Sequence, residues 1–370
     1  MRKRGLRLAF LGLSLSSSWG NGHATTYRAL LKALHARGHD ILFLERETPW
    51  YAAHRDLLKP GFCRLALYGS PTGLRRYQSE LAAADAVIVG SFVPDGIAIG
   101  EWVLANTQGV TAFYDIDTPA TLASVETDSC EYLTAEQIPR YDLYLSFSSG
   151  PMLHRLKSRF GARRATALYC SVDPDLYRPQ PTAPRWDLGY LGTYSRDRQP
   201  ALERLLLEPA CRMRQLRFVV AGAQYPPNVR WPANVDHIAH IAPARHAGFY
   251  SSLRWALNLT RAEMIRAGHS PSVRLFEAAA SGAPIITDCW PGLEELFRPN
   301  AEIVAAAGTG DVMAALALPE LQRKLIASSA RRRVLAQHTS RRRAMEIERH
   351  LLATIQGVVM DSEDSVAQHA

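Results

Sequence analysis

Short apolar runs alternate with stretches of helical periodicity along most of the chain. In the first half the apolar runs cover residues 8–15, 41–44, 86–89, 110–114, 143–147 and 166–169, and helical periodicity covers 23–36 and 74–84. In the second half, runs at 188–191, 216–221, 255–259 and 284–287 alternate with helical stretches at 200–207 and 272–280. This alternation predicts an α/β protein with parallel sheets covered by helices on both faces.

A proline-rich stretch interrupts the pattern, with Pro174, Pro179, Pro181 and Pro184 close together. Proline density of this kind is typical of a linker. The 370 residues suit two domains of about 150–200 residues each. We expect an N-terminal domain over 1–172, a linker over 173–186 and a C-terminal domain over 187–340. A last helix over 341–358 and a polar, disordered tail over 359–370 complete the prediction.

Charge and cysteine content narrow the possible partners and compartment. The net charge of +8 favours anionic partners, and part of it lies in Arg331–Arg333 and Arg341–Arg343. These triplets are either solvated helix faces or a patch for an anionic membrane or a charged acceptor. They lack interleaved aromatic residues, so we expect no nucleic-acid partner. Five widely spaced cysteines argue against a disulfide framework and favour the cytoplasm.

Two interpretations of the apolar start are open: a secretory signal or a first strand. The run 8–15 is short, contains Gly12 and Ser14, and precedes a Trp-Gly-Asn-Gly sequence without a cleavage motif. We therefore interpret it as a buried strand. No run reaches the roughly 18 apolar residues that a membrane span needs, so none is expected.

The loop after this first strand is the first candidate site. Gly20, Asn21 and Gly22 precede a helix that opens at His23, and a helix start offers free N–H groups to an anion. Thr25 stands where a dinucleotide fingerprint would have its third glycine, so a nicotinamide enzyme is disfavoured. His23 is either an ordinary helix-start residue or a cleft residue for proton transfer.

The strongest signal is the segment 268–288. Ser270, Pro271 and Ser272 form a helix start whose N–H groups, with Val273 and Arg274, are suited to a diphosphate. Glu277 lies in the middle of that helix among small and apolar residues, where its carboxylate needs partners such as ribose hydroxyls.

This segment resembles the donor-binding signature of GT-B glycosyltransferases, especially glycosyltransferase family 4, in which a helix with the pattern E-A-x-A-x-G-x-P precedes a strand. The stretch 171–179 resembles the interdomain motif of that family, and the C-terminal half is similar to CgeB-type spore-maturation-like glycosyltransferases. The resemblance implies two Rossmann-like domains with parallel sheets facing a central cleft, and a last helix that crosses back to the N-terminal domain. It gives Glu277 the donor ribose and the loop 270–274 the diphosphate.

One position departs from the family pattern. Family 4 usually has a second glutamate eight residues before the one matched by Glu277, and here His269 occupies that position. The resemblance places it near the transferred sugar, where it is either a plain loop residue or a ligand of a sugar hydroxyl. Retention of configuration cannot be carried over.

Further candidates follow other strands. After 188–191, Gly192, Ser195 and Arg198 are candidates for donor binding, with Arg196 in reserve. Related enzymes place a basic residue there, and an arginine can bind phosphate oxygens bidentately; otherwise Arg198 forms a surface ion pair. Arg261 follows the strand at 255–259, at the sheet edge where ligands of open α/β sheets bind.

Asp115 and Asp117 follow another strand and are acceptor ligands, a general base, or caps of a helix at 118–125. Their spacing also fits a metal site, which GT-B enzymes usually do not need, so no metal or cofactor is expected. Trp50, Tyr51 and His54 are guessed to line an acceptor pocket.

The sequence thus predicts a metal-independent glycosyltransferase whose donor is a nucleotide-diphosphate sugar such as a UDP-sugar, with the donor sugar and the base left open. A nucleotide-sugar epimerase or a non-catalytic binder on the same fold are the alternatives. The acceptor is left open.

Overall fold

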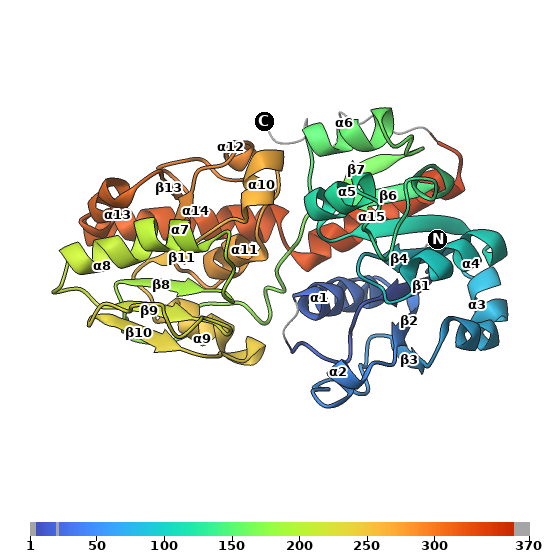
Figure 1. Ribbon diagram of the computed structural model, residues 1–370, viewed down its shortest axis with the longest axis horizontal. Helices are drawn as coiled ribbons and strands as arrows, with labels where there is room; N and C mark the ends of the chain where they lie inside the picture. Colours follow the sequence, from blue (N-terminus) through green and yellow to red (C-terminus); the bar gives the residue numbers. More distant parts are fainter. Residues whose placement is uncertain (1–4, 20–21, 359–370) are drawn as a thin grey trace. The chain divides into compact units, whose positions relative to one another are not determined.

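The computed structural model describes residues 5–19 and 22–358, which divide into two compact units (Figure 1). Unit 1 contains the chain up to Cys170 together with the segment from Ser340 onward, and unit 2 is Ser171–Thr339. The proline-rich stretch 173–186 thus belongs to unit 2, and the last helix belongs to unit 1.

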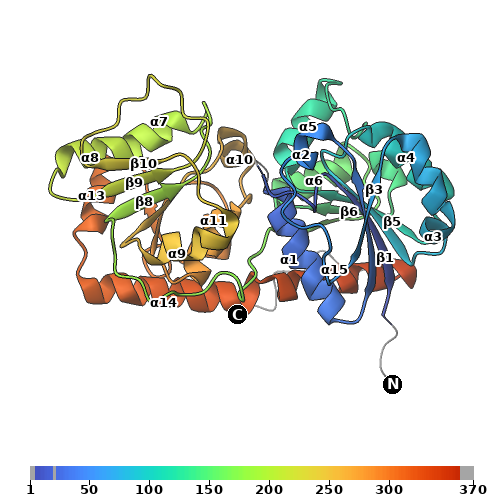
Figure 2. The same ribbon diagram turned by 90° about the horizontal axis from the view of Figure 1, so that it is seen from below.

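Unit 1 is built on a seven-stranded parallel sheet in the order β3-β2-β1-β4-β5-β6-β7. Helix α1 lies on one face, where α15 packs against it, and α3 and α4 lie on the other (Figure 2). The strands are β1 (Arg7–Gly12), β2 (Asp40–Arg46), β3 (Arg64–Tyr68), β4 (Ala86–Gly90), β5 (Val110–Asp115), β6 (Leu143–Ser146) and β7 (Ala165–Ala167). The helices are α1 (His23–Ala36), α2 (Pro49–Ala52), α3 (Gln78–Ala82), α4 (Gly96–Asn106), α5 (Thr118–Glu126), α6 (Pro151–Ser158) and α15 (Ser340–Ile355).

Unit 2 repeats this plan with a six-stranded parallel sheet in the order β10-β9-β8-β11-β12-β13. Helices α7 and α8 cover one face and α9 and α11 the other (Figures 1 and 2). The strands are β8 (Leu188–Leu191), β9 (Phe218–Ala221), β10 (Val235–Ile238), β11 (Ala256–Asn258), β12 (Ile285–Asp288) and β13 (Val304–Ala306). The helices are α7 (Gln199–Leu202), α8 (Glu208–Arg212), α9 (His246–Ser251), α10 (Ala262–Ala267), α11 (Val273–Ala280), α12 (Leu293–Leu296), α13 (Thr309–Leu316) and α14 (Glu320–Gln337).

Both sheets have a topological switch point. The chain leaves β1 in one direction across the sheet and later returns to β4 on its other side, and β8 and β11 are related in the same way. Loops diverge at such a point and leave a crevice at the carboxyl ends of the strands. The predicted site residues follow β1 and β5 in unit 1 and β8 and β11 in unit 2.

The central strands form because their residues are apolar on both faces. Side chains of β4 and β9 are fully buried, as a parallel sheet with two helical layers requires. The core of unit 2 includes Leu188, Phe218, Val220, Trp255 and Ile286. The predicted first strand, α1 and the alternation in both halves are confirmed.

Candidate functional site

In unit 2, the loop after β8 contains the predicted donor-binding residues Gly192, Ser195 and Arg198. A Cβ at Gly192 would lie 2.4 Å from the Tyr190 hydroxyl, so this position requires glycine. Arg198 donates from Nη2 to the Thr193 carbonyl at 2.8 Å. Ser195 hydrogen-bonds Asp197, which also accepts from the Ala262 amide at 3.0 Å and ties this loop to the one after β11.

Three arginines from separate segments act on one another in unit 2. Burial and the nearby positive charges of Arg274 and Arg261 lower the pKa of Arg198. The alternative of a surface ion pair is not what the structure has: Asp197 lies nearby, but Arg198 is part-buried and its Nε has no hydrogen-bond partner among the described residues. Repulsion between like charges is relieved when an anion binds between them.

Arg274 is anchored at the start of α11. Its Nη1 donates to Ser272 Oγ at 2.9 Å and to the Leu259 carbonyl at 3.3 Å, and its guanidinium lies over the Tyr190 ring. Ser272 is the N-cap of α11, as predicted, and Ser270 is buried with its hydroxyl donating to the Gly268 carbonyl at 3.0 Å. Val273 is the first residue of the helix. The segment 270–274 is therefore a pre-formed turn.

Glu277 is 5% exposed and sits among tyrosines. Burial raises the pKa of this carboxyl to about 7, although the hydroxyls of Tyr177 and Tyr250 and the charge of Arg274 oppose the shift. Tyr177 comes from the proline-rich stretch, and His246 hydrogen-bonds it at 3.3 Å. Neither tyrosine was predicted as a site residue. The available signal was the aromatic position of the interdomain motif at 171–179, which Tyr177 occupies; Tyr250 lies outside that motif.

A second buried carboxyl lies beside this site and was also missed. Asp288 ends β12 and accepts from the Thr260 amide at 2.7 Å and the Thr260 hydroxyl at 2.8 Å. Burial raises its pKa despite these hydrogen bonds. It orients the residue before Arg261, so its role is to shape the loop after β11.

His269 occupies an unusual backbone conformation, with a φ of +49° in the left-handed region. Its amide donates to the Pro291 carbonyl at 2.7 Å, and its Nδ1 lies 3.1 Å from Glu295 Oε2. The histidine is thus held through both its backbone and its ring.

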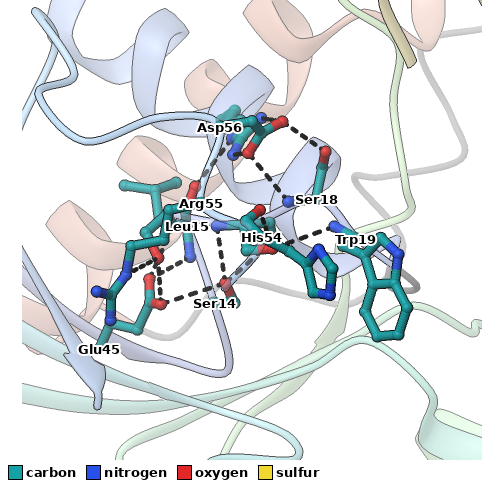
Figure 3. Close-up of polar contacts among 11 residues, drawn as sticks. Ser14, Leu15, Ser18, Trp19, Glu45, His54, Arg55 and Asp56 are labelled. Carbon is teal, nitrogen blue, oxygen red and sulfur yellow. Dashed lines mark hydrogen bonds and ion pairs between the residues drawn. The ribbon is translucent and has the colours of Figure 1, made fainter. Parts of the chain in front are cut away.

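In unit 1, the loop after β1 is braced by two carboxylates (Figure 3). Glu45, at the end of β2 and fully buried, accepts from the Leu15 and Ser16 amides at 2.7 and 2.8 Å and from the Ser16 hydroxyl at 2.6 Å. Asp56 accepts from the Ser18 hydroxyl at 2.6 Å and pairs with Arg28. Burial alone would raise the pKa of Asp56, but the hydrogen bonds from Arg28 and Ser18 outweigh it and lower the pKa to about 2.

This braced loop leads into the predicted phosphate or acceptor loop. Gly20 and Asn21 lie outside the described residues, and Gly22 is the N-cap of α1. His23 opens α1 with its ring edge-on to Phe92, and burial lowers its pKa to about 4. Its ring is therefore neutral at physiological pH and can accept a proton only weakly.

Asp115 is a correction to the candidate list. Its side chain is fully buried, with Oδ2 accepting from Tyr144 at 2.5 Å and Oδ1 from Thr121 at 2.7 Å. It has no open side for an acceptor, because Tyr144 and Thr121 occupy it. Asp117 is partly exposed and is the N-cap residue of α5, the position that the capping interpretation predicted.

Three aromatic side chains gather beside the braced loop. Trp19 stacks on His54 with ring centroids 4.4 Å apart and meets Trp50 edge-on at 5.3 Å. Trp50 is 64% exposed, whereas Tyr51 is buried. Sequence analysis included Trp50, Tyr51 and His54; Trp19 is the addition, and Tyr51 is closed to a ligand.

The arginine triplets are largely engaged with the protein. Arg333 pairs with Glu302 at 2.9 Å, Arg331 donates to the Ala280 carbonyl, and Arg343 is buried against Tyr169 and Glu346. These three guanidinium groups are thus held against the protein, whereas Arg332 and Arg341 are exposed. Among the described residues, no helix combines the length and apolarity of a membrane span, and no cluster of three or more His, Cys, Asp or Glu suits a metal ion.

Comparisons with known proteins agree with this architecture. Residues 198–349 match a family described as Glycosyl transferase-like. No curated protein sequence matches the chain.

Three solved structures with similar folds illustrate the likeness. Sucrose-phosphate synthase from Thermosynechococcus elongatus is 14% identical, with a TM-score of 0.68 over 94% of this chain and 99% of that one. HepE from Anabaena, in complex with UDP and glucose, is 12% identical, with a TM-score of 0.70 over 94% and 100%. An α-glucosyltransferase in complex with UDP-glucose and DNA containing an abasic site is 11% identical, with a TM-score of 0.71 over 94% and 100%. The predicted GT-B fold is confirmed.

Proposed function

We propose that this protein is a glycosyltransferase that transfers a sugar from UDP to an acceptor. The observation that carries the proposal is a cluster of three arginines at the switch point of unit 2. The positive charges of Arg261 and Arg274 repel that of Arg198. A bound diphosphate would neutralise these positive charges. During transfer the arginines would stabilise the negative charge that develops on the leaving nucleoside diphosphate. The family match over 198–349 and the UDP-containing relatives support this choice of substrate.

The remaining donor contacts follow from the same geometry. The pre-formed turn of Ser270, Ser272 and Val273 directs N–H groups at the start of α11 toward the diphosphate. Gly192 and Ser195 border this space from the loop after β8. Glu277, buried beside Tyr177 and Tyr250, would accept hydrogen bonds from the ribose hydroxyls.

The acceptor contacts are proposed for unit 1. The braced loop 14–19 presents Trp19 with Trp50 and His54, and flat exposed rings suit the face of a sugar. Gly20, Asn21 and Gly22 continue that loop, and His23 and Asp117 are the polar side chains offered to the acceptor hydroxyl. No cofactor or metal is invoked.

A thermal-shift titration with UDP and UDP-glucose tests the donor site. UDP at 100 times its Kd should stabilise the native protein by about 2.7 kcal/mol. Arg198→Ala should lose most of this shift, because the cluster loses one of its three charges. Arg196→Ala is the matched control, since Arg196 is an exposed arginine two residues away in the same loop. Equal shifts in both variants would contradict the assignment of Arg198.

A second measurement separates an enzyme from a binder. Incubation with UDP-glucose should release UDP by transfer or slow hydrolysis, and the release should depend on Arg198. Binding without any release under a panel of UDP-sugars and acceptor glycans would leave a sugar-nucleotide binding protein in place of a transferase. Conversion of the bound sugar to its epimer would identify an epimerase.

A further inference from the structure

Glu295 lies outside every motif found in the sequence, yet it contacts His269, the candidate ligand of a sugar hydroxyl. Its Oε2 is 3.1 Å from His269 Nδ1. Glu295 belongs to the short helix α12 after β12, and His269 immediately precedes the turn at 270–274. The two residues are 26 positions apart in the chain and are brought together by the fold.

The geometry around the ring indicates that this contact is built into the loop. The His269 amide is bound to the Pro291 carbonyl, and the backbone at His269 is left-handed. Gly292, with a φ of +88°, lies under the ring: a Cβ there would come within 2.5 Å of Nδ1. The ring is 18% exposed and packed onto the segment 291–295. Its direction is therefore set by the loop and not by free rotation.

Hydrogen-bond chemistry then assigns the two ring nitrogens. An ionised carboxylate only accepts hydrogen bonds, so Nδ1 carries the proton and Nε2 of the neutral ring keeps its lone pair. Nε2 has no hydrogen-bond partner in residues 5–19 and 22–358. An acceptor atom is thus left available beside the proposed diphosphate turn.

We propose that Glu295 is a positioning residue that fixes the Nδ1–H tautomer of His269, so that Nε2 accepts a hydrogen bond from a hydroxyl of the transferred sugar. This inference rests on the proposed function for its sugar ligand. The tautomer itself does not depend on that function and can be observed in the ligand-free protein. A carboxylate-oriented histidine substitutes here for the carboxylate that the resembling family has at position 269.

Long-range ¹H–¹⁵N NMR of ¹⁵N-histidine-labelled full-length protein tests the tautomer. The spectrum of His269→Gln identifies the His269 signals by their loss. At a pH where the ring is neutral, wild type should show a protonated Nδ1 and an unprotonated Nε2. Glu295→Ala should shift the ring toward the Nε2–H form, which is the commoner tautomer of free histidine. Glu294→Ala, at the exposed neighbour in the same helix, should leave the signals unchanged. An Nε2–H tautomer in wild type, or identical signals in Glu295→Ala, would overturn the proposal.

UDP release from UDP-glucose provides the functional arm. Loss of a partner that orients a metal-ligating histidine typically costs about 10–100-fold. For this sugar-binding histidine we expect the lower end of that range, with kcat falling by roughly ten-fold in Glu295→Ala. The KM for UDP-glucose should change little, because the arginine cluster still binds the diphosphate. A changed tautomer with unchanged kcat would refute the positioning role. Absence of turnover in wild type would instead count against the proposed function and leave the tautomer result intact.

Discussion

At the scale of single residues, Glu277 links the stability of unit 2 to pH. In the folded protein its pKa is raised by burial to about 7, against 4.5 for the ordinary group. The folded state therefore holds the proton more tightly than the unfolded chain. The stabilisation from the neutral carboxyl is complete below pH 4.5 and is lost as the pH rises through 7, a difference on the order of 3 kcal/mol.

Glu277→Gln removes this titration, so the variant should gain stability relative to wild type when the pH is raised from 5 to 8. Thermal unfolding of the ligand-free protein at the two pH values measures the effect. Glu263→Gln, at an exposed glutamate of α10, is the control and should track wild type at both. A constant difference between Glu277→Gln and wild type would show that Glu277 does not titrate as described.

Single carboxylates also show where inference from sequence ends. Asp115 ends β5, and Glu45 is the last residue but one of β2. Only Asp115 was predicted as a site residue, because Asp117 follows it at a spacing typical of carboxylate sites. The structure closes Asp115 with Tyr144, which is 29 residues away, and gives Glu45 the loop of Ser16, which is 29 residues before it. Both outcomes depend on contacts between distant segments, which no local pattern contains.

At the scale of elements, the strands in the middle of each sheet were predicted, and of the four edge strands only β7 was, from the apolar run 166–169. β8 and the helix α1 have the predicted bounds because their apolar residues follow one period without interruption. β3 and β10 were missed: β3 is only partly buried, and β10 carries Asp236 and His237 on exposed positions. Edge strands tolerate polar residues, which removes the hydrophobic signal.

The loop 14–19 is an element whose order depends on one buried group. The amides of Leu15 and Ser16 both donate to Oε2 of Glu45, and the Ser16 hydroxyl donates to Oε1. Glu45→Gln keeps only one acceptor oxygen, so either the two amides or the hydroxyl lose their acceptor. We expect a loss of stability of about 1–3 kcal/mol and faster amide hydrogen exchange in peptides covering the loop.

Glu47→Gln is the matched control for this loop. Glu47 follows on the same strand end but is 41% exposed, and its ion pair with Arg55 lies at the surface. Surface pairs contribute about 0–1 kcal/mol, so exchange in the loop should stay close to wild type. If amide hydrogen exchange in the loop is equally fast in Glu45→Gln and Glu47→Gln, Glu45 does not brace the loop.

At the scale of the whole molecule, the chain builds unit 1 from two distant segments. The C-terminal helix α15 packs against α1, and its Ile347 and Leu351 are fully buried. Arg37 of the first segment pairs with Glu348 of this helix. Unit 2 is one continuous segment with its own core. A destabilising substitution in α15 should therefore lower the stability of unit 1, although the helix follows unit 2 in sequence.

Leu351→Ala tests this division. Removing a fully buried leucine costs about 2–5 kcal/mol, and Met345→Ala in the same helix, at a side chain 46% exposed, is the control. Hydrogen exchange in Leu351→Ala should rise in peptides from α1, β1 and β5 and stay unchanged in β8, β9 and α11. UDP should still protect α11, because the proposed donor contacts lie within unit 2. Equal loss of protection in both units would mean that they unfold as one cooperative body, and the donor site could then not be studied separately from the acceptor side.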